Sequence, residues 1–306
     1  MNKLKYQGGI TKLICSKLAT KNRNQFVKII ENELGRLSLA IDAKKSILIN
    51  VVSFSSNRDF QEQVLSILSF LKNIGKPKLW TLYSDGSHTN EQIDQLKLNF
   101  DFINVVSKHW DNLTKLPPDT KSELLPYSEY FIDYAKKTAL GKRLYYYLNH
   151  HIDAPTLFLD SDIIFYSKSS FFHDYIEEEI NGWYLPDFEW GCLDSRYKEK
   201  HSKQMYQVNG GFFMFNKNLS EMQGGLDFFK SLNMKYEYFS DQNIFHILLR
   251  DNGFIPFDPR IFILDSDDQF DFSYKYKPTD MAIRHYTGPV RHKMWQNDYK
   301  WHLSLK

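Results

Sequence analysis

Short apolar runs alternate with segments of helical periodicity between residues 46 and 106, and this alternation constrains the fold more than any other feature of the sequence. The run 46–54 (SILINVVSF) is rich in β-branched residues, as expected for a strand buried on both faces. Strands that alternate with helices favour an α/β fold with a mostly parallel, twisted sheet flanked by helices. Further strands are predicted at 78–83, 102–106 and 156–160, and helices at 61–73 and 91–98.

The regions outside this alternation are predicted from periodicity and turn residues. Residues 107–120 read as a loop, and 127–150 as one or two helices with Gly141 as the expected break. From about residue 165 we expect mixed strands and loops. Residues 1–45 are predicted to form a helical N-terminal extension, because apolar residues recur on one helical face at Phe26, Ile29, Ile30, Leu34 and Leu37.

Composition and charge exclude several classes of protein. The chain has 306 residues and a formal net charge of +2, so no charge excess points to nucleic acid as a partner. Its two cysteines, Cys15 and Cys192, cannot build a disulfide framework or a metal cluster. No apolar run approaches the ~18 residues of a membrane span, and the first residues lack a signal peptide's apolar stretch. We therefore expect a cytoplasmic protein, with a peripheral association at the inner face of a membrane left open.

The segment 156–165 (TLFLDSDIIF) carries the main chemical signal. An apolar strand ends in two carboxylates, Asp160 and Asp162, separated by one residue. Magnesium and manganese prefer oxygen ligands, often carboxylates together with substrate phosphates, so this D-x-D spacing predicts a divalent metal site. A second copy, formed by Asp265 and Asp267, continues into polar residues and reads as a solvated loop or a helix cap. We therefore place the metal on the first copy.

Side chains near the ends of other strands are candidates for ligand binding, because open α/β sheets bind ligands there. Ser53 and Phe54 end the first strand. Asp85 follows the second strand and could accept a hydrogen bond from a base or ribose, or simply form an Asp-Gly turn. Lys142 and Arg143 precede the D-x-D strand and could reach a diphosphate or lie on a solvated helix face.

Two later segments carry groups suited to a sugar nucleotide. Asn209, Gly210 and Gly211 precede an apolar run. The glycines would let the backbone approach a ligand, and the amide of Asn209 can both donate to and accept from sugar hydroxyls. Asp241 and Gln242 stand at the start of a predicted helix, where Asp241 could also serve as a cap.

A third segment, 284–295 (RHYTGPVRHKMW), completes a resemblance. Together with the D-x-D, N-x-G and Asp-Gln segments, it resembles the family 8 glycosyltransferases, which include bacterial lipopolysaccharide galactosyl- and glucosyltransferases and glycogenin. The resemblance covers about residues 46–295 and rests on short motifs in the same order. The family has H-x-x-G-P-x-K-P-W here, and His285, Gly288 and Pro289 match it. Arg291 stands at the family's Lys position, whereas Lys293 and the following Trp come two residues late.

The resemblance implies a GT-A fold and a function. Residues 46–306 would be the catalytic domain of a retaining, metal-dependent enzyme that moves a hexose from a UDP-sugar to a hydroxyl of a saccharide or glycolipid. Manganese or magnesium would be held by Asp160, Asp162 and His285. Asp241 and Gln242 would act at the donor sugar. The residues that would bind the donor are Ser53, Phe54, Asp85, Arg143, Asp162, Asn209, Gly210, Gly211, Gly288, Arg291 and Lys293. One of the two cations Arg291 and Lys293 should pair with the leaving diphosphate, and we favour Arg291 because it keeps the family's spacing from Gly288.

The acceptor site and the alternatives are less defined. Asp187, Glu189 and Trp190 could line an acceptor pocket, although burial is the commoner role of Trp. A nucleotide-sugar-binding protein with an inactive site stays open as an alternative. So does a sugar-nucleotide pyrophosphorylase, which should have a Gly-rich, Arg-containing loop after the first strand, where this chain has SFSSNRDF.

Overall fold

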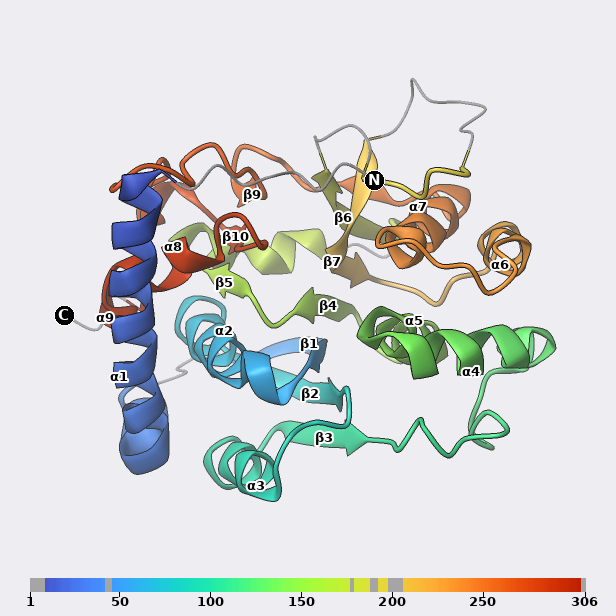
Figure 1. The fold of residues 1–306 in the computed structure, drawn as a ribbon, viewed down its shortest axis with the longest axis horizontal. Coiled ribbons are helices and arrows are strands. Elements are labelled where there is room, and N and C mark those ends of the chain that lie inside the picture. Colours follow the sequence, from blue (N-terminus) through green and yellow to red (C-terminus); the bar gives the residue numbers. More distant parts are fainter. Residues whose placement is uncertain (1–8, 42–45, 177–178, 188–191, 198–205, 304–306) are drawn as a thin grey trace.

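A seven-stranded sheet forms the centre of the computed structural model, which describes residues 9–41, 46–176, 179–187, 192–197 and 206–303 (Figure 1). Its strand order is β3-β2-β1-β4-β7-β6-β8, and only β7 runs antiparallel to its neighbours. The predicted α/β class with a mostly parallel sheet is therefore confirmed. The strands are β1 Ser46–Ser55, β2 Lys76–Ser84, β3 Ile103–Ser107, β4 Thr156–Asp160, β6 Gly182–Asp187, β7 Gln207–Phe215 and β8 Ile255–Pro256.

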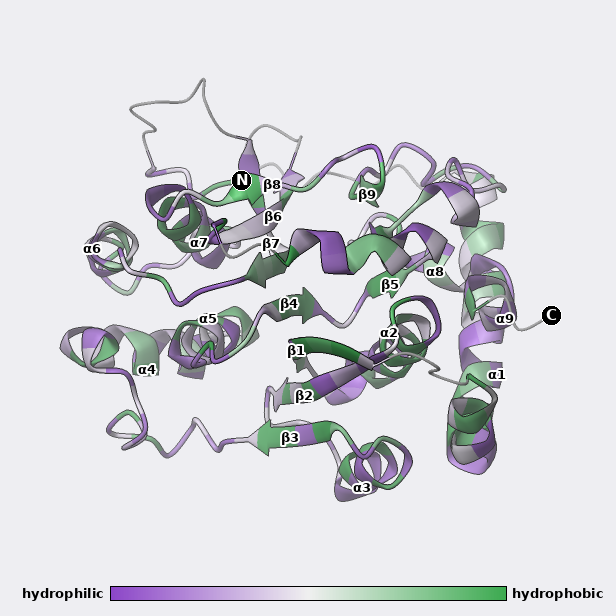
Figure 2. Ribbon diagram, turned by 180° about the vertical axis from the view of Figure 1, so that it is seen from behind, coloured by the Kyte–Doolittle hydropathy of each residue, from purple (hydrophilic) through white to green (hydrophobic). Residues whose placement is uncertain are grey.

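Alternate residues of the central strands point to opposite faces of the sheet and build two hydrophobic cores. In β4, Leu157 and Leu159 join one core and Phe158 joins the other. The first core is covered by α1, α2, α3, α8 and α9, and the second by α4 to α7. Figure 2 shows the hydrophobic strands enclosed between these helices. The helices are α1 Ile10–Ala40, α2 Phe60–Asn73, α3 Asn90–Asn99, α4 Ser128–Lys137, α5 Ala139–Asn149, α6 Gln223–Ser231, α7 Ser240–Asp251, α8 Arg291–Gln296 and α9 Tyr299–Leu303.

A small second sheet continues from the main one. It contains β5 (Ile163–Phe165), β10 (Ile283–His285) and β9 (Phe262–Ile263) in the order β5-β10-β9. A two-residue turn joins β4 to β5, so the chain leaves the main sheet at the D-x-D segment. The pairing of β5 with β10 is antiparallel and places segments more than 100 residues apart side by side.

The predicted N-terminal helix forms and packs against other helices that cover the first core. Phe26, Ile30 and Leu34 of α1 are buried in the first core, and Ile29 and Leu37 pack partly buried against it. In Figure 1 α1 lies along one side of the molecule, next to α8 and α9. The helix thus shares its core with residues of the predicted catalytic domain, and the boundary at residue 45 stays a prediction.

The helix break predicted at Gly141 is wrong. The break lies at Thr138, whose hydroxyl accepts a hydrogen bond from Gly141 N at 2.9 Å and so begins α5. Gly141 is needed for another reason, because a Cβ atom there would lie 2.3 Å from the backbone of Tyr134 in α4. Within the described ranges, no helix is long and apolar enough to cross a membrane.

Candidate active site

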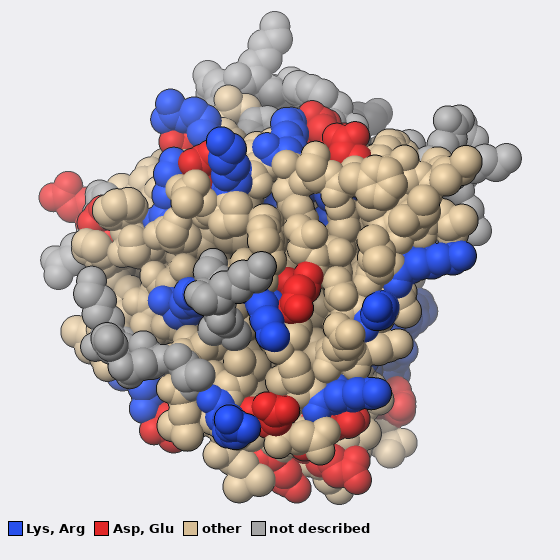
Figure 3. All heavy atoms as spheres, turned by 90° about the vertical axis from the view of Figure 1, so that its left-hand side faces the viewer, with Lys and Arg blue, Asp and Glu red and all other residues tan. Residues whose placement is uncertain are grey.

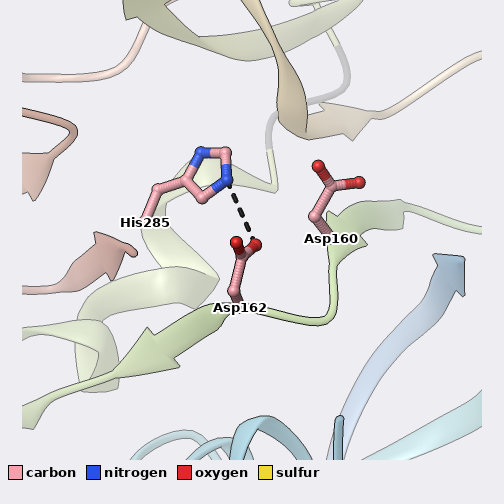
Figure 4. Close-up of side chains that lie close together, drawn as sticks. All are labelled: Asp160, Asp162 and His285. Atoms are coloured by element: carbon pink, nitrogen blue, oxygen red, sulfur yellow. Dashed lines mark ion pairs between the residues drawn. The ribbon is translucent and has the colours of Figure 1, made fainter. Parts of the chain in front are cut away.

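Asp160, Asp162 and His285 converge where the two sheets meet (Figure 4). Asp160 ends β4, and Asp162 lies in the turn before β5. Main-chain pairing aligns His285 with Ile163, and Tyr286 N donates to the carbonyl oxygen of Asp162 at 3.0 Å. The backbone therefore brings His285 to the carboxylate pair.

The three side chains form a set suited to a divalent cation. One ligand atom from each lies within 4.8 Å of the others, and His285 Nε2 is 3.2 Å from Asp162 Oδ1. Two carboxylates and an imidazole match the ligands of manganese, and of magnesium less closely. Asp162 and His285 are buried, whereas Asp160 is partly exposed. No other group of three potential ligands is found in the described part of the chain.

Asn209 orients the imidazole. Its Oδ1 accepts from Gly211 N at 3.0 Å, which identifies this atom as the amide oxygen, an acceptor only. His285 Nδ1, 3.0 Å from the same oxygen, must therefore be the donor. Because Nδ1 donates to Asn209, Nε2 is the nitrogen that faces the carboxylates, and once deprotonated it would offer its lone pair to a metal, as in many metal-ligating histidines. Burial lowers the pKa of His285, but Asp162 and Asp160 outweigh it, so the pKa is raised above its usual value.

Gly211 makes room for these ligands. A Cβ atom there would lie 2.4 Å from His285 Cε1 and 2.9 Å from Asp160 Oδ2. A Cβ atom on Gly210 would lie 2.9 Å from Arg143 Nη2. We predicted that these glycines let the backbone approach a ligand. They are buried in β7 instead, and the groups that approach them are side chains of the site.

Arg143 joins the D-x-D pair to α7. Its Nη1 donates to both oxygens of Asp160 at 2.8 Å, and its Nη2 donates to Asp241. Burial lowers the pKa of Arg143, but the two carboxylates outweigh it and hold the cation charged. Burial raises the pKa of Asp241, although Arg143 opposes this. Arg143 is therefore buried among carboxylates, and the predicted alternative of a solvated helix face is wrong.

Asp241 and Gln242 both point into the site from the first turn of α7. Phe239 is the N-terminal cap residue of this helix, so Asp241 does not act as its cap. Gln242 Oε1 accepts from Gly210 N at 2.9 Å, and its Nε2 donates to Cys192 O at 2.7 Å. Gln242 thus fixes β7 against the chain that follows β6.

Arg291 extends over the other side of the carboxylate pair. It donates to Asp162, and its Nη1 donates to Asp59 at 3.0 Å. Burial lowers the pKa of Arg291, but Asp162 and Asp59 outweigh burial, so the pKa is raised above its usual value. For Asp162, burial raises the pKa, but His285 and Arg291 together bring it well below its usual value.

Asp59 was not predicted from the sequence. It lies in η1 (Asn57–Asp59) after the carboxyl end of β1, in the SFSSNRDF segment. A carboxylate beyond a strand end is the signal that could have drawn attention to it. Its pairing with Arg291 depends on residues 232 positions apart, which local patterns cannot reveal.

Two predicted donor-binding residues lie elsewhere. Lys293 is fully buried and its Nζ donates to the carbonyl oxygens of Asp271 at 2.7 Å and Ser273 at 2.8 Å. Ser53 is also fully buried, and its Oγ accepts from Trp80 Nε1 at 2.8 Å. Neither side chain can reach a ligand in this structure, so these two assignments were wrong.

The remaining predicted residues are spread around the site. Phe54 is partly exposed and pairs in register with Asp160, whereas Gly288 is exposed in the turn before α8. Asp187 ends β6, 3.5 Å from the amide nitrogens of Asn209 and Gln242. Glu189 and Trp190 lie outside the described residues.

Asp85 lines a separate open depression of about 260 Å³. Its carboxylate accepts from Ser87 N at 2.9 Å, which is the predicted turn, and its carbonyl accepts from Lys142 Nζ at 2.7 Å. The depression lies beyond the carboxyl ends of β2 and β3 and is lined by Asp85, Gly86, Ser87, Lys108, His109, Trp110, Asp111 and Lys142.

The second D-x-D copy holds a lysine. Lys275 Nζ lies 3.0 Å from Asp265 and 2.8 Å from Asp267. The loop character predicted for this copy is confirmed at these two residues. The following Asp268 is not solvated, however, because it is buried in an ion pair with Arg284 at 2.5 Å.

The fold is that of solved glycosyltransferases. An active-site mutant of LgtC matches with a TM-score of 0.50 and 12% identity over 78% of this chain and 88% of that one. GlyE of Streptococcus pneumoniae TIGR4 matches with a TM-score of 0.50 and 14% identity over 84% of this chain and 62% of that one. The bifunctional glycosyltransferase WbbM matches with a TM-score of 0.50 and 13% identity over 84% of this chain, which spans 51% of WbbM. These likenesses confirm the GT-A-like fold. No protein-family model and no curated protein sequence matches the chain.

Proposed function

We propose that this protein is a metal-dependent glycosyltransferase that moves a hexose from a UDP-sugar to a hydroxyl of a saccharide or glycolipid. The observation that carries the proposal is the convergence of Asp160, Asp162 and His285 at the end of β4. Ligands of such sheets bind at the carboxyl ends of the strands. The glycosyltransferase fold of the solved relatives supports the same activity.

The residues around the carboxylate pair suit a leaving diphosphate. When bound, a divalent cation would neutralise part of the charge that develops on the departing phosphates. Arg291 supplies a second positive charge next to the same place, with its side chain 39% exposed. Its planar guanidinium can bind two phosphate oxygens at once. Arg291 rather than Lys293 is therefore the cation that we assign to the diphosphate.

The opposite side of the pair suits the donor sugar. Arg143 donates to both Asp160 and Asp241 and so holds Asp241 close to the metal ligands. This position supports our assignment of Asp241 as a catalytic residue. Asn209 and Gln242 complete this side of the site through β7. Their roles at the sugar rest on the resemblance to family 8 glycosyltransferases.

Retention of configuration is also part of the proposal. Retaining glycosidases use a carboxylate nucleophile, but Asp241 is 1% exposed and bound to Arg143. A same-face attack, in which the leaving phosphate assists deprotonation of the acceptor, fits this arrangement better. Asp241 then stabilises charge near the sugar through Arg143 instead of attacking it.

The test is a panel of nucleotide sugars measured with manganese, with magnesium and with EDTA. Thermal stabilisation identifies the donor, since a ligand at 100 times its dissociation constant adds about 2.7 kcal/mol to the stability of the folded state. Release of the nucleoside diphosphate in the presence of saccharide acceptors then measures turnover. Full turnover in excess EDTA would contradict the metal role.

The same panel separates the two alternatives. A binding protein with an inactive site would be stabilised by a nucleotide sugar and show no turnover with any acceptor. A pyrophosphorylase would instead release pyrophosphate from a nucleoside triphosphate and a sugar phosphate.

A double variant in the second D-x-D copy, Asp265→Asn combined with Asp267→Asn, is the matched control for changes at Asp160 and Asp162. This second copy binds Lys275 outside the site.

A further inference from the structure

The first turns of α1 carry apolar side chains on both faces. Cys15 and Ala19 face the core and are 0% and 5% exposed. On the opposite face, four apolar residues spaced three and four apart point away from the protein. We call them the exposed stripe: Ile10 (80% exposed), Leu13 (58%), Ile14 (41%) and Leu18 (45%).

Two aromatic residues extend the apolar surface beside these turns. The loop before Lys275 packs on α1, where Cys15 Sγ donates to Asp271 O at 3.7 Å. Its residues Phe270 and Phe272 are 38% and 57% exposed. Figure 3 looks at the side of the molecule on which α1 lies in Figure 1, and broad uncharged areas separate its charged side chains. An apolar surface of this kind marks an interaction site.

The charge of this part of the chain is one-sided. No acidic residue precedes Glu31, whereas the first 30 residues contain seven basic ones: Lys3, Lys5, Lys12, Lys17, Lys21, Arg23 and Lys28. The whole chain has 39 basic and 37 acidic residues, so the rest of the chain carries five more acidic than basic residues. Lys17, Lys21 and Lys28 are exposed on the same face of α1 as the stripe and form no ion pair with the described residues.

We propose that the N-terminal half of α1 docks on the surface of a membrane that contains anionic lipids. An amphipathic helix binds in the plane of such a surface when apolar side chains enter the headgroup region and lysines meet anionic headgroups. The exposed stripe supplies the apolar side chains, and Lys17, Lys21 and Lys28 supply the positive charges. A second copy of this chain fits less well, because it would bring two sets of lysines together.

This inference does not rest on the proposed glycosyl transfer. The exposed stripe lies on α1, whereas the candidate site lies at the junction of the two sheets. Binding to vesicles needs no donor, acceptor or metal, so it can succeed or fail independently of turnover.

The experiment is co-sedimentation of the whole protein with vesicles of phosphatidylcholine, with and without 30% phosphatidylglycerol. We expect about tenfold tighter binding to the anionic vesicles at low salt, and a marked loss at high salt because the lysine contacts are screened. Leu13→Glu combined with Ile14→Glu should weaken binding about tenfold or more. Leu39→Glu is the matched control, since Leu39 is 81% exposed at the other end of α1 and should have no effect.

Charge variants test the second half of the proposal. Lys17→Glu combined with Lys21→Glu should remove the preference for anionic vesicles, whereas Lys97→Glu on α3 should not. Circular dichroism melting checks that all variants fold like the wild type, as expected for exposed positions. Equal affinity for both kinds of vesicle, or equal loss for Leu39→Glu, would overturn the proposal. Failure to bind vesicles, together with a dimer in light scattering that the Leu13 and Ile14 changes abolish, would show that the stripe binds a second copy instead.

Discussion

The guanidinium of Arg291 donates to the carboxylate of Asp162, although 129 residues separate them in the sequence. Asp162 thereby faces two cationic partners, with His285 on its other oxygen. A divalent ion at the site would have to share Asp162 with Arg291 or displace it. This relationship makes the role of each partner measurable.

Asp162→Asn should abolish metal-dependent turnover. The change removes a charged ligand and leaves Arg291 and His285 without their shared carboxylate, so we expect a loss of about 100-fold or more in kcat. The measurement is turnover at saturating donor, with manganese binding followed by calorimetry. Asp267→Asn in the second D-x-D copy should change neither quantity, and retained manganese affinity in Asp162→Asn would contradict the assignment.

Arg291→Ala and Lys293→Ala should differ in kind. Arg291→Ala should lower kcat about 100-fold, because a cation at the leaving diphosphate is lost, while the melting temperature changes little. Lys293→Ala should lower the free energy of unfolding by about 2–3 kcal/mol, since the change removes a fully buried side chain and the charged donor of two carbonyl groups. Its turnover per folded molecule should be retained. A large loss of kcat only in Lys293→Ala would reverse our assignment.

Asp59→Asn should weaken metal binding. Without Asp59, Arg291 keeps Asp162 as its one hydrogen-bonded carboxylate among the described residues and competes harder with the ion, so we expect a dissociation constant about fivefold higher. Arg291→Ala should act in the opposite direction and tighten metal binding in the absence of donor. Asp258→Asn, which breaks a surface pair with Arg260, is the control. Tighter metal binding in Asp59→Asn would show that Asp59 does not steer Arg291.

Asp241→Asn should lower kcat far more than it lowers affinity for UDP. Asp241 lies next to Arg143 and Asp160 and is assigned to the sugar, so the change should cost about 100-fold in turnover and leave UDP binding nearly unchanged. Turnover and UDP titration of the same variant decide the matter. A parallel loss of both would place Asp241 at the nucleotide, and a loss of melting temperature alone would make its role structural.

Metal affinity should rise with pH. The folded-state pKa of His285 is raised, so its pairing with Asp162 stabilises the metal-free protein fully below about pH 6.5 and is lost as pH rises through that raised pKa. The folded-state pKa of Asp162 is lowered, so its contribution is present above about pH 4 and is lost as pH falls through the lowered value. An ion must displace the proton of His285, and its affinity should therefore fall up to about tenfold per pH unit below that pKa. Manganese titrations at pH 6 and pH 8 test this, and His285→Gln should remove the difference.

The sequence predicted those features that depend on neighbouring residues. The strand 156–160 and its two carboxylates follow from an apolar run and a fixed spacing, and the structure has the same bounds. His285 was found only through the resemblance, because its approach to Asp162 arises from the pairing of β5 with β10. Asp59 was not predicted, because its contact with Arg291 also joins segments that are far apart in the sequence.

Two residues that we assigned wrongly show what spacing in the sequence cannot predict. Lys293 and Ser53 have the right chemistry and stand near the right motifs, but the helix α8 and the strand β1 turn them into the protein. Which way a side chain points depends on how its element packs, and spacing from a motif does not encode that. The helix break at Thr138 rather than Gly141 has a similar cause, since Gly141 serves the contact between α4 and α5.

The junction between the two sheets gives the candidate site a mechanical character. Asp160 belongs to the large sheet, whereas His285 belongs to the small one. At the site, the two sheets are connected by the short turn that carries Asp162 and by the hydrogen bond between His285 and Asn209 of β7. An ion held by all three ligands would add a further link between the sheets. Binding of the ion would then restrict the motion of the small sheet relative to the large one. The rigidity of the small sheet would therefore depend on whether the metal site is filled.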